Sequence, residues 1–274
     1  MLGYEVTLPG GLSKDGKLVN RTTFKPLTGK VEQTFIEYSP DSGRPEFVTN
    51  ILAAALDKIG SYYANEEIVS ELCVADRQYL LLKLATILNG DLMWLKVCCQ
   101  YCHEYFDVDI RRSELPVEGA SSEYPLVTIK LGDDVIVARV PNGNDQNKIQ
   151  DLSDDEAMSE LLYSCILTVN NSDVTEQYVR QLSEKEIETI DQLLDEVSPA
   201  VCDKVLVSCP ECDNEQKIRL DHSSLTGINK RQFYDEVHTL ASQYHWSENS
   251  ILELPKERRM LYLELINSSS GYTV

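Results

Sequence analysis

The sequence predicts a mixed α+β fold, and three features carry that prediction. Two Cys-x-x-Cys pairs, Cys99–Cys102 and Cys209–Cys212, each lie between stretches in which apolar and polar residues alternate as in β-strands. A shift of 110 residues relates the two pairs and also superposes their apolar neighbours: Leu95 on Val205, Val97 on Val207, Val108 on Ile218 and Ile110 on Leu220. Elsewhere, apolar residues recur with the period of amphipathic helices. We therefore expect two similar β-hairpins accompanied by helical segments.

The opening segment predicts two strands joined by turns. Tyr4–Leu8 alternates between apolar and polar residues, and Asn20–Leu27 is typical of a second strand. Pro9–Gly11 and Lys14–Gly16 are typical of turns, and the first 45 residues are expected to be extended and loop-rich. Residues 1–112 are thus expected to form an N-terminal β/helical part that ends with the first cysteine pair.

Two helices are predicted before the first cysteine pair. From Glu46 onward, apolar residues share one helical face: Val48, Ile51, Leu52, Ala55, Ile59, Tyr62 and Tyr63. A second helix is expected to begin near Asp76, a residue type favoured at N-caps, and to end at Gly90, a type favoured just past a helix. Its inward residues are expected to be Leu80, Leu81, Leu84, Ile87 and Leu88.

Residues 113–200 are predicted to be an insertion between the two cysteine pairs. Leu126–Val140 is typical of a β-hairpin with its turn at Gly132–Asp134. Residues 201–222 then carry the second cysteine pair, which completes the ribbon that the first pair begins.

Two acidic helices are predicted within the insertion. Ser153 with Glu156, and Ser183 with Glu186, have the spacing of a capping box. The apolar residues behind the first cap are Leu161, Leu162, Cys165 and Ile166. The stretch 151–200 holds 13 acidic and 2 basic side chains, a net charge of −11. This charge is typical of a solvated helical face, and a docking surface for a basic partner is the alternative.

Residues 230–274 predict a C-terminal helical module that follows a linker near Ser223–Asn229. Its first helix has an apolar stripe: Phe233, Val237, Leu240, Ala241 and Tyr244. Pro255 can open a last helix that runs through Ile266. We expect this module to dock a partner, whose acidic groups would meet Lys256, Arg258 and Arg259. The alternative is that the stripe packs on the protein's own ribbon.

The paired cysteines predict a metal centre. A tetrahedral Zn²⁺ needs four ligands, and two residues between cysteines let a tight turn direct both sulfurs to one ion. The candidate ligands are Cys99, Cys102, Cys209 and Cys212. Four thiolates leave no coordination position for water, so the zinc is expected to be structural. Substitution of a ligand by Cys98 or His103, a thioredoxin-type redox pair and disulfides are the alternatives.

The other cysteines do not form a pattern that predicts a metal or catalytic site. Cys73 and Cys165 lie among apolar helical residues and are expected in the core, and Cys202 is expected to be a buried free thiol. The chain has only four histidines and lacks phosphate-binding glycine loops, nucleophile elbows and His-Glu-x-x-His motifs. We therefore expect no enzyme activity and no small-molecule substrate.

The charge balance limits the partners. The 274 residues carry 25 Lys and Arg against 45 Asp and Glu, a net charge of −20. Such a surface repels phosphates, so binding to nucleic acid or to an anionic membrane is not expected. No apolar run approaches the roughly 20 residues that span a bilayer, and the opening residues do not resemble a signal peptide. The sequence predicts a soluble protein of a reducing cytosol.

Several segments, taken together and in order, resemble the baseplate hub and baseplate assembly proteins of contractile-tailed, T-even-like bacteriophages and related contractile injection systems. The resembling segments are VTLPGG, FKPLTGKVEQ, LCVADRQYLLLKLATILNGD, CCQYCHEYFDVDI, VARVPNGNDQ, SCPECDNEQKIRLD and HTLASQYHWSENSILELPKERRMLYLELI. They cover most of the chain, and the cysteine pairs are the most specific of them.

The resemblance implies a structural or chaperone-like assembly role in a tail baseplate or hub, with hub or tape-measure proteins as partners. It places the chain in the host cytoplasm during assembly, and in the virion baseplate if it stays in the particle. The only functional residues that the resemblance assigns in this sequence are the four paired cysteines, as zinc ligands. The rival classes are a zinc-ribbon regulator that contacts nucleic acid and a thiol oxidoreductase.

Overall fold

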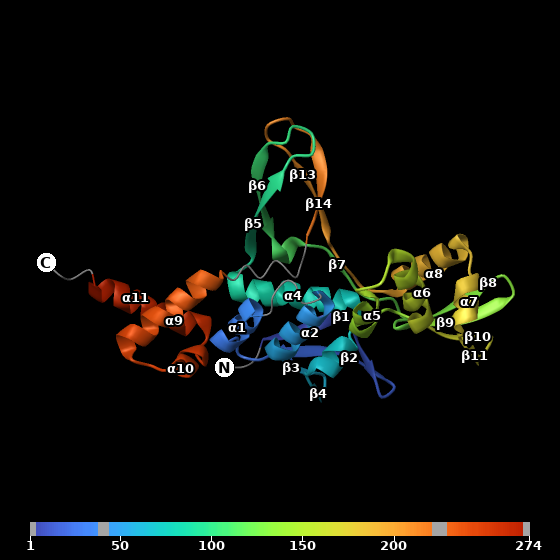
Figure 1. Cartoon of the computed structure of the whole chain (residues 1–274), viewed down its shortest axis with the longest axis horizontal. Coiled ribbons are helices and arrows are strands. Elements are labelled where there is room, and N and C mark those ends of the chain that lie inside the picture. The colour runs from blue at the N-terminus through green and yellow to red at the C-terminus, as the bar shows by residue number, and fades with distance from the viewer. Residues whose placement is uncertain (1–3, 38–43, 221–228, 271–274) are drawn as a thin grey trace.

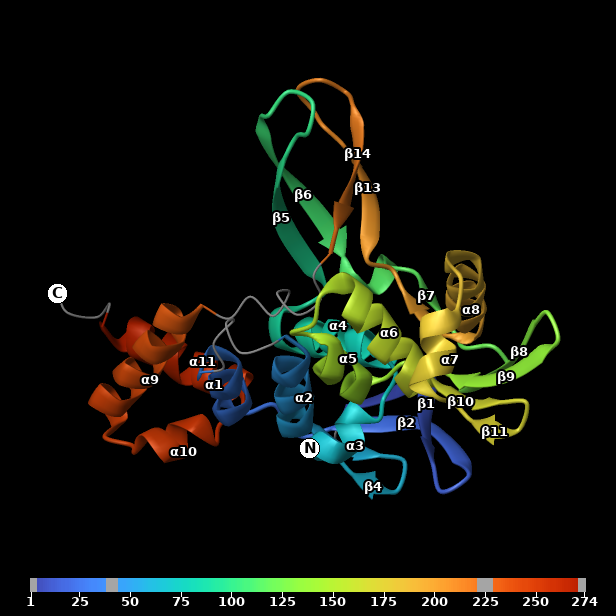
Figure 2. The same ribbon diagram turned by 45° about the vertical axis from the view of Figure 1, so that its right-hand side comes forward.

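The computed structural model describes residues 4–37, 44–220 and 229–270, so most of the predicted linker lies outside the described residues. Three helical units lie in a row, and a ribbon of two β-hairpins projects from the middle one (Figure 1). The C-terminal unit lies at one end of the row and the unit formed by the insertion at the other. Figure 2 shows the same order after a 45° turn. The mixed α+β class is confirmed.

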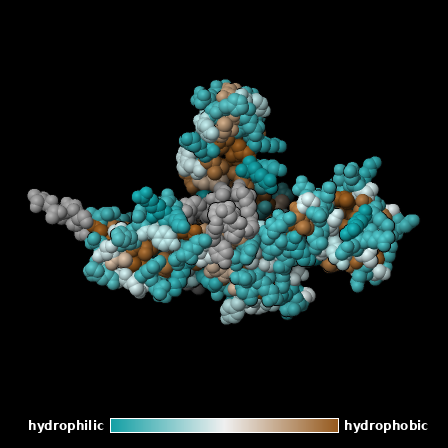
Figure 3. Space-filling view, in the orientation of Figure 1, coloured by the Kyte–Doolittle hydropathy of each residue, from teal (hydrophilic) through white to brown (hydrophobic). Residues whose placement is uncertain are grey.

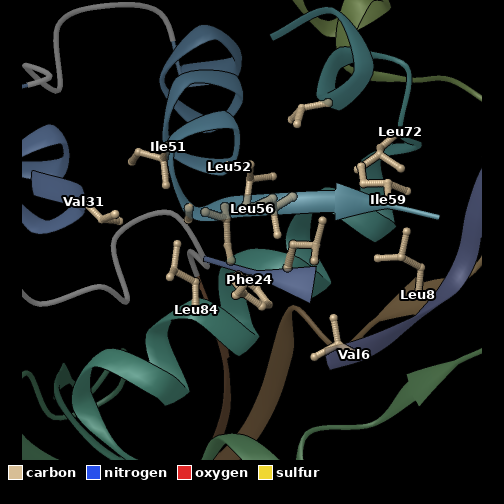
Figure 4. Packing of buried hydrophobic residues seen from close by; sticks show 14 of the residues in the cluster. Val6, Leu8, Phe24, Val31, Ile51, Leu52, Leu56, Ile59, Leu72 and Leu84 are labelled. Atoms are coloured by element: carbon tan, nitrogen blue, oxygen red, sulfur yellow. The ribbon is translucent and has the colours of Figure 1, made fainter. Parts of the chain in front are cut away.

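The central unit comes from the first part of the chain. Its antiparallel sheet has the order β1 (Glu5–Lys14), β2 (Lys17–Phe24), β3 (Leu56–Ile59) and β4 (Tyr62–Tyr63). Its helices are α1 (Gly29–Glu37), α2 (Arg44–Ala55), α3 (Glu66–Ser70) and α4 (Val74–Asn89). Figure 4 shows the core between them, in which Phe24, Leu56 and Leu84 are almost fully buried. Burying each such side chain contributes about 1.5–3 kcal/mol.

The insertion forms the outer unit. Its strands are β8 (Leu126–Leu131), β9 (Asp134–Arg139), β10 (Ile166–Val169) and β11 (Ser172–Asp173), in the sheet order β11-β10-β9-β8. Its helices are α5 (Gly143–Ile149), α6 (Asp154–Cys165), α7 (Glu176–Gln181) and α8 (Glu184–Val197). The predicted hairpin is confirmed, as are the capping boxes that open α6 and α8. Ile166, assigned from the sequence to the first acidic helix, instead begins β10.

The ribbon and its base contain the remaining strands. They are β5 (Leu92–Cys98), β6 (Tyr105–Arg111), β7 (Val117–Glu118), β12 (Ala200–Val201), β13 (Lys204–Ser208) and β14 (Glu215–Arg219), with a 3₁₀ turn at Arg112–Glu114. β5 pairs with β6, β13 with β14, and β7 with β12. Figure 3 shows hydrophobic surface on the stem of the ribbon, where Trp94 and Leu206 are exposed.

The C-terminal unit consists of α9 (Lys230–Tyr244), α10 (Glu248–Leu252) and α11 (Lys256–Ser270). Three residues of its predicted stripe are buried within the unit itself rather than against the ribbon, and Ala241 and Tyr244 are half-buried beside them. Phe233, Val237 and Leu240 pack with Ile251 and Leu252 of α10. Beside them, the rings of Tyr244 and Trp246 stack and both meet Tyr262 edge to face, with centroids 4.8–5.5 Å apart. The unit therefore has a core of its own.

The basic residues of α11 were expected to meet a partner's acidic groups, and for two of them the structure differs. Arg259 is fully buried and its Nη2 lies 2.5 Å from Glu32 Oε1 of α1 and 3.9 Å from Glu236 Oε2 of α9. Lys256 Nζ donates to the backbone oxygen of Leu88 at 2.9 Å. Both side chains hold the C-terminal unit against the central one, because Glu32 and the backbone oxygen of Leu88 belong to the central unit.

The predicted turn at Pro9–Gly11 is wrong. β1 runs through these residues, and its register with β2 shifts between Thr7 and Leu12 as in a β-bulge. Gly11 has a φ of 109°, which favours glycine. The N–H groups of Gly10 and Gly11 donate to the buried Asp76 carboxylate at 2.9 and 2.7 Å. Asp76 thus anchors the bulge, and Cys73 is the N-cap of α4.

The predicted helix from Glu46 to Tyr63 is only partly correct. α2 ends at Ala55, and Ile59 and Tyr62 lie in strands β3 and β4 on either side of a turn at Gly60. Helix α2 and strand β3 line the same core. Their buried positions happen to follow one another with a helical spacing, which is why the sequence predicts a single helix. The short helices α1, α3, α5, α7 and α10 were not predicted either.

Among the described residues, no helix has the length and apolar character needed to cross a membrane.

Candidate metal centre

Two β-hairpins of the same design present the predicted ligands. β5 and β6 pair without a register break from Leu92 opposite Arg111 to Cys98 opposite Tyr105. β13 and β14 pair from Lys204 opposite Arg219 to Ser208 opposite Glu215. Each cysteine pair occupies the loop between its strands, as the 110-residue repeat predicts.

The two loops have the same backbone structure. In the first, the N–H of Cys99 donates to the oxygen of Glu104 at 2.9 Å, and that of His103 donates to the oxygen of Cys99 at 3.1 Å. In the second, Cys209 with Asn214 (3.0 Å) and Asp213 with Cys209 (2.9 Å) make the equivalent bonds. His103 and Asp213 both adopt left-handed conformations, with φ of 63° and 56°. Each loop therefore aims both of its sulfurs in one direction.

The four sulfur atoms converge. All lie within 4.8 Å of one another, with Cys99 Sγ 3.7 Å from Cys212 Sγ and Cys102 Sγ 3.7 Å from Cys209 Sγ. A disulfide bond would need about 2.05 Å. Sulfurs at the corners of a tetrahedron around zinc, with Zn–S distances of about 2.3 Å, lie about 3.8 Å apart. The structure thus brings together all four predicted residues in an arrangement that fits a tetrahedral metal ion.

The loop backbone favours the thiolate form of Cys99. The N–H of Cys102 makes the largest contribution and, with that of Tyr101, lowers the pKa of Cys99 to about 6. The N–H of Glu104 also lowers the pKa of Cys102, but burial and the neighbouring cysteines outweigh it and raise that pKa to about 12. A metal would displace such retained protons, because cysteines bind metals as thiolates.

Gln216 joins the two hairpins beside the sulfurs, and sequence reasoning missed it. Its Oε1 accepts the N–H of Gln100 at 2.7 Å, and its Nε2 donates to the oxygen of Cys98 at 3.1 Å. Its side chain is buried. The 110-residue shift places Gln216 where the first hairpin has Phe106. A polar residue at an apolar position of the repeat is therefore the feature of the sequence that could have identified Gln216.

The alternative ligands lie apart from the cluster. Cys98 is exposed, and its Sγ faces the backbone oxygens of Cys99 and His103 at 3.8 and 3.6 Å. Cys73 and Cys165 are buried, as expected, whereas Cys202 is only half-buried and contacts the oxygen of Lys204. Within the described ranges, the four paired cysteines are the one cluster of His, Cys, Asp and Glu side chains close enough to hold a metal.

A small apolar cluster packs against the cysteines. Val97, Phe106 and Val207 pack around the buried Cys99 and Cys209. At the base of the ribbon, Arg112 donates to the oxygen of Gly90 at 2.8 Å, just after α4 ends. The cysteine cluster therefore lies at the tip of a ribbon whose base contacts the end of α4. Four thiolates at one ion fill its coordination sphere, which suits a structural site.

Comparison with known proteins gives one match. A family model described as T4 bacteriophage base plate protein matches residues 1–224, which include the central unit, the outer unit and both cysteine pairs. No curated protein and no solved structure matches the chain.

Proposed function

The chain belongs to the T4 bacteriophage base plate protein family, and from this membership we propose that it is a non-enzymatic structural or chaperone-like assembly protein of a contractile tail baseplate or hub. The match over residues 1–224 is the observation that carries the proposal. We further propose that its metal is zinc and that the zinc is structural, because four thiolates leave no open position for substrate or water.

The surface of the ribbon supports a role in protein contacts. Trp94 on β5 and Leu206 on β13 have 66% and 59% of their surface exposed. Tryptophan is enriched among the residues that dominate binding energy at protein interfaces. Hub or tape-measure proteins of the tail are the proposed partners, and the net charge of −20 makes nucleic acid a poor one.

Deletion of the gene from the phage tests the proposal. We expect lysates of the deletion phage to contain few complete tails by electron microscopy, with wild-type protein supplied in trans restoring them. Mass spectrometry of purified particles then separates the two roles: a baseplate component is present in them, and a chaperone is absent. Normal numbers of complete tails without the gene would overturn the proposal.

A further inference from the structure

Three helix pairs in the described part of the chain share one design, in which a short helix and a long one are joined by a tight turn. The pairs are α3–α4, α7–α8 and α10–α11, and their connecting turns contain Leu72-Cys73, Leu182-Ser183 and Leu254-Pro255. The first two pairs are related by the same shift of 110 residues that relates the cysteine loops, since Asn65 corresponds to Thr175 and Leu72 to Leu182. The duplication therefore extends beyond the ribbon into the helical units.

Two hydrogen bonds recur in all three pairs. The side chain that caps the short helix accepts an N–H three residues on: Asn65 from Ile68 (2.9 Å), Thr175 from Tyr178 (3.2 Å) and Ser247 from Ser250 (3.2 Å). The leucine of the turn donates its N–H three residues back: Leu72 to Val69 (3.3 Å), Leu182 to Val179 (3.2 Å) and Leu254 to Ile251 (3.0 Å). The three turns thus have the same shape.

Two of the three turns hold the N-terminus of a helix from a neighbouring unit. The oxygen of Leu72 accepts the N–H of Gly143, the first residue of α5, at 3.2 Å. The oxygen of Leu254 accepts the N–H of Gly29, the first residue of α1, at 3.1 Å. The residues before these glycines, Asn142 and Thr28, form isolated β-bridges with Cys73 and Pro255. These contacts are where each unit joins the next.

Glycine is required at both contacts because an arginine of the long helix lies against it. A Cβ on Gly143 would lie 2.5 Å from Arg77 Nη1, and one on Gly29 would lie 2.9 Å from Arg259 Nη1. Arg77 and Arg259 occupy the same position after their turns, four residues past Cys73 and Pro255. The corresponding residue of α8 is Ile187.

The third turn, Leu182-Ser183, holds no such helix among the described residues. Ser183 is exposed, whereas the corresponding Cys73 is buried. Arg180 has 74% of its side chain exposed, whereas the corresponding Ser70 and Leu252 are buried. The surface that a neighbouring unit covers twice in this chain is therefore uncovered at its third occurrence.

A groove marks the uncovered position. It has a volume of about 510 Å³, lies between α6 and α7 of the outer unit, and is lined by Leu152, Asp155, Glu156, Ser159, Glu160, Tyr163, Glu176, Val179 and Arg180. In the central unit, α5 contacts both α2 and α3. Since α6 and α7 correspond to α2 and α3, the groove lies where a docked helix would.

We propose that this groove and the Leu182-Ser183 turn bind the N-terminus of an α-helix of another tail protein, which enters through a Thr-Gly or Asn-Gly step. A second copy of this chain is not the proposed occupant, because the Thr-Gly and Asn-Gly helix starts found among the described residues, at Gly29 and Gly143, are held within the same chain. The inference rests on the proposed role in tail assembly, since it names the kind of partner involved.

The charges of the groove specify the partner further. Four carboxylates line it, those of Asp155, Glu156, Glu160 and Glu176, against the single Arg180, whose Nη2 lies 3.3 Å from Glu176 Oε2. Negative charge favours the positive end of an incoming helix dipole and any lysine or arginine on that helix. In the C-terminal unit, Arg259 pairs with Glu32 of the docked helix α1. Ile187 stands at the position of Arg259 and carries no charge, so the incoming helix should have an apolar residue where α1 has Glu32.

Site-specific photo-crosslinking tests the proposal on the full-length chain. The photoreactive residue benzoyl-phenylalanine replaces Ser159 in the groove or, as a control, Glu196 on the exposed far end of α8, in cells that produce all the tail proteins. We expect position 159 to crosslink to another tail protein, within about one helical turn of a Thr-Gly or Asn-Gly helix start. We expect Glu160→Lys to lower the yield at least tenfold and Glu188→Lys to leave it unchanged.

Three outcomes would overturn the proposal: no crosslink from position 159, a crosslink only to a second copy of this chain, or a crosslinked peptide without such a helix start. The gene deletion described above separates this failure from that of the proposed function. If tails need the chain but position 159 gives no crosslink, only the groove proposal fails. If tails assemble without the chain, the proposed function fails.

Discussion

Arg259 and Glu32 illustrate how single buried residues connect the units of this molecule. Their charged atoms lie 2.5 Å apart, in positions almost without solvent exposure, and 227 residues separate them in the chain. Taking two charges out of water is costly, and their attraction offsets that cost only while both are present. The pair therefore makes the joint between α1 and α11 sensitive to loss of either side chain.

Replacing Arg259 with methionine should weaken this joint strongly. Glu32 would be left buried without a cation, a loss of about 3–5 kcal/mol, and Arg259→Met with Glu32→Gln should recover much of it. Denaturant unfolding followed by Trp246 fluorescence in a Trp94→Phe background measures the effect on the C-terminal unit. Arg231→Met, at an exposed ion pair, is the control. An equal effect of Arg259→Met and Arg231→Met would contradict the prediction.

The cysteines allow an equally local test. Elemental analysis of purified wild-type protein should find about one zinc per chain, and Cys209→Ser should lose it, because a three-thiolate site binds the ion less tightly. Cys98→Ser removes an adjacent, exposed thiol that lies apart from the cluster, and should keep the zinc. Retention of zinc by Cys209→Ser, or its loss from Cys98→Ser, would count against the assigned ligands.

At the scale of helices and strands, packing between units depends on close backbone approach. α5 can dock on the α3–α4 turn only because Gly143 has no side chain, and Arg77 opposite it is held by Thr49 Oγ1 and by the oxygens of Val69 and Pro45. A methyl group there has no free space, and neither the arginine nor α5 can yield without losing hydrogen bonds.

Gly143→Ala should therefore destabilise the contact between the central and outer units by about 1–3 kcal/mol, the usual cost of overpacking. Gly119→Ala is a matched control, because its new Cβ would have only one atom within 4 Å, at 3.8 Å. Thermal unfolding of both variants checks the prediction, and a similar small shift for the two would refute it.

The elements that the sequence predicted correctly are those specified by local signals. The capping boxes at Ser153 and Ser183 and the two cysteine hairpins need only neighbouring residues to be recognised. The errors arise where the decisive partner is distant. The Gly10-Gly11 bulge depends on Asp76, and the burial of Arg259 depends on Glu32. The four cysteines that converge at the site were recognisable from their spacing, whereas Gln216 was recognisable only through its place in the repeat.

At the scale of the whole molecule, the ribbon projects from the central unit and is held together by two small clusters. Its strands are held at their base by an apolar cluster that includes Leu82 and Ala85 of α4, and at their tip by the four cysteines and the buried Val97, Phe106 and Val207. The central and outer units have larger cores of their own. Loss of metal should therefore separate the hairpins and leave those units folded.

Hydrogen exchange with and without a chelator measures this difference. Amides of residues 92–111 and 204–219 should exchange at least tenfold faster after metal removal, while those of α4 and α8 should change little, because metal binding stabilises only the structure that depends on it. Increased exchange throughout the central unit would instead mean that the metal supports the whole fold.

The distance along the chain between the two cysteine pairs has a consequence for biosynthesis. A ribosome adds about 5–20 residues per second, so Cys209 follows Cys99 by roughly 5 to 20 seconds. During that interval every strand and helix of the central unit has already been made, because all of them precede Cys99. The nascent chain thus carries only two of the four clustered thiols while the outer unit is being made, and the four-cysteine site can be completed only after the entire outer unit has left the ribosome.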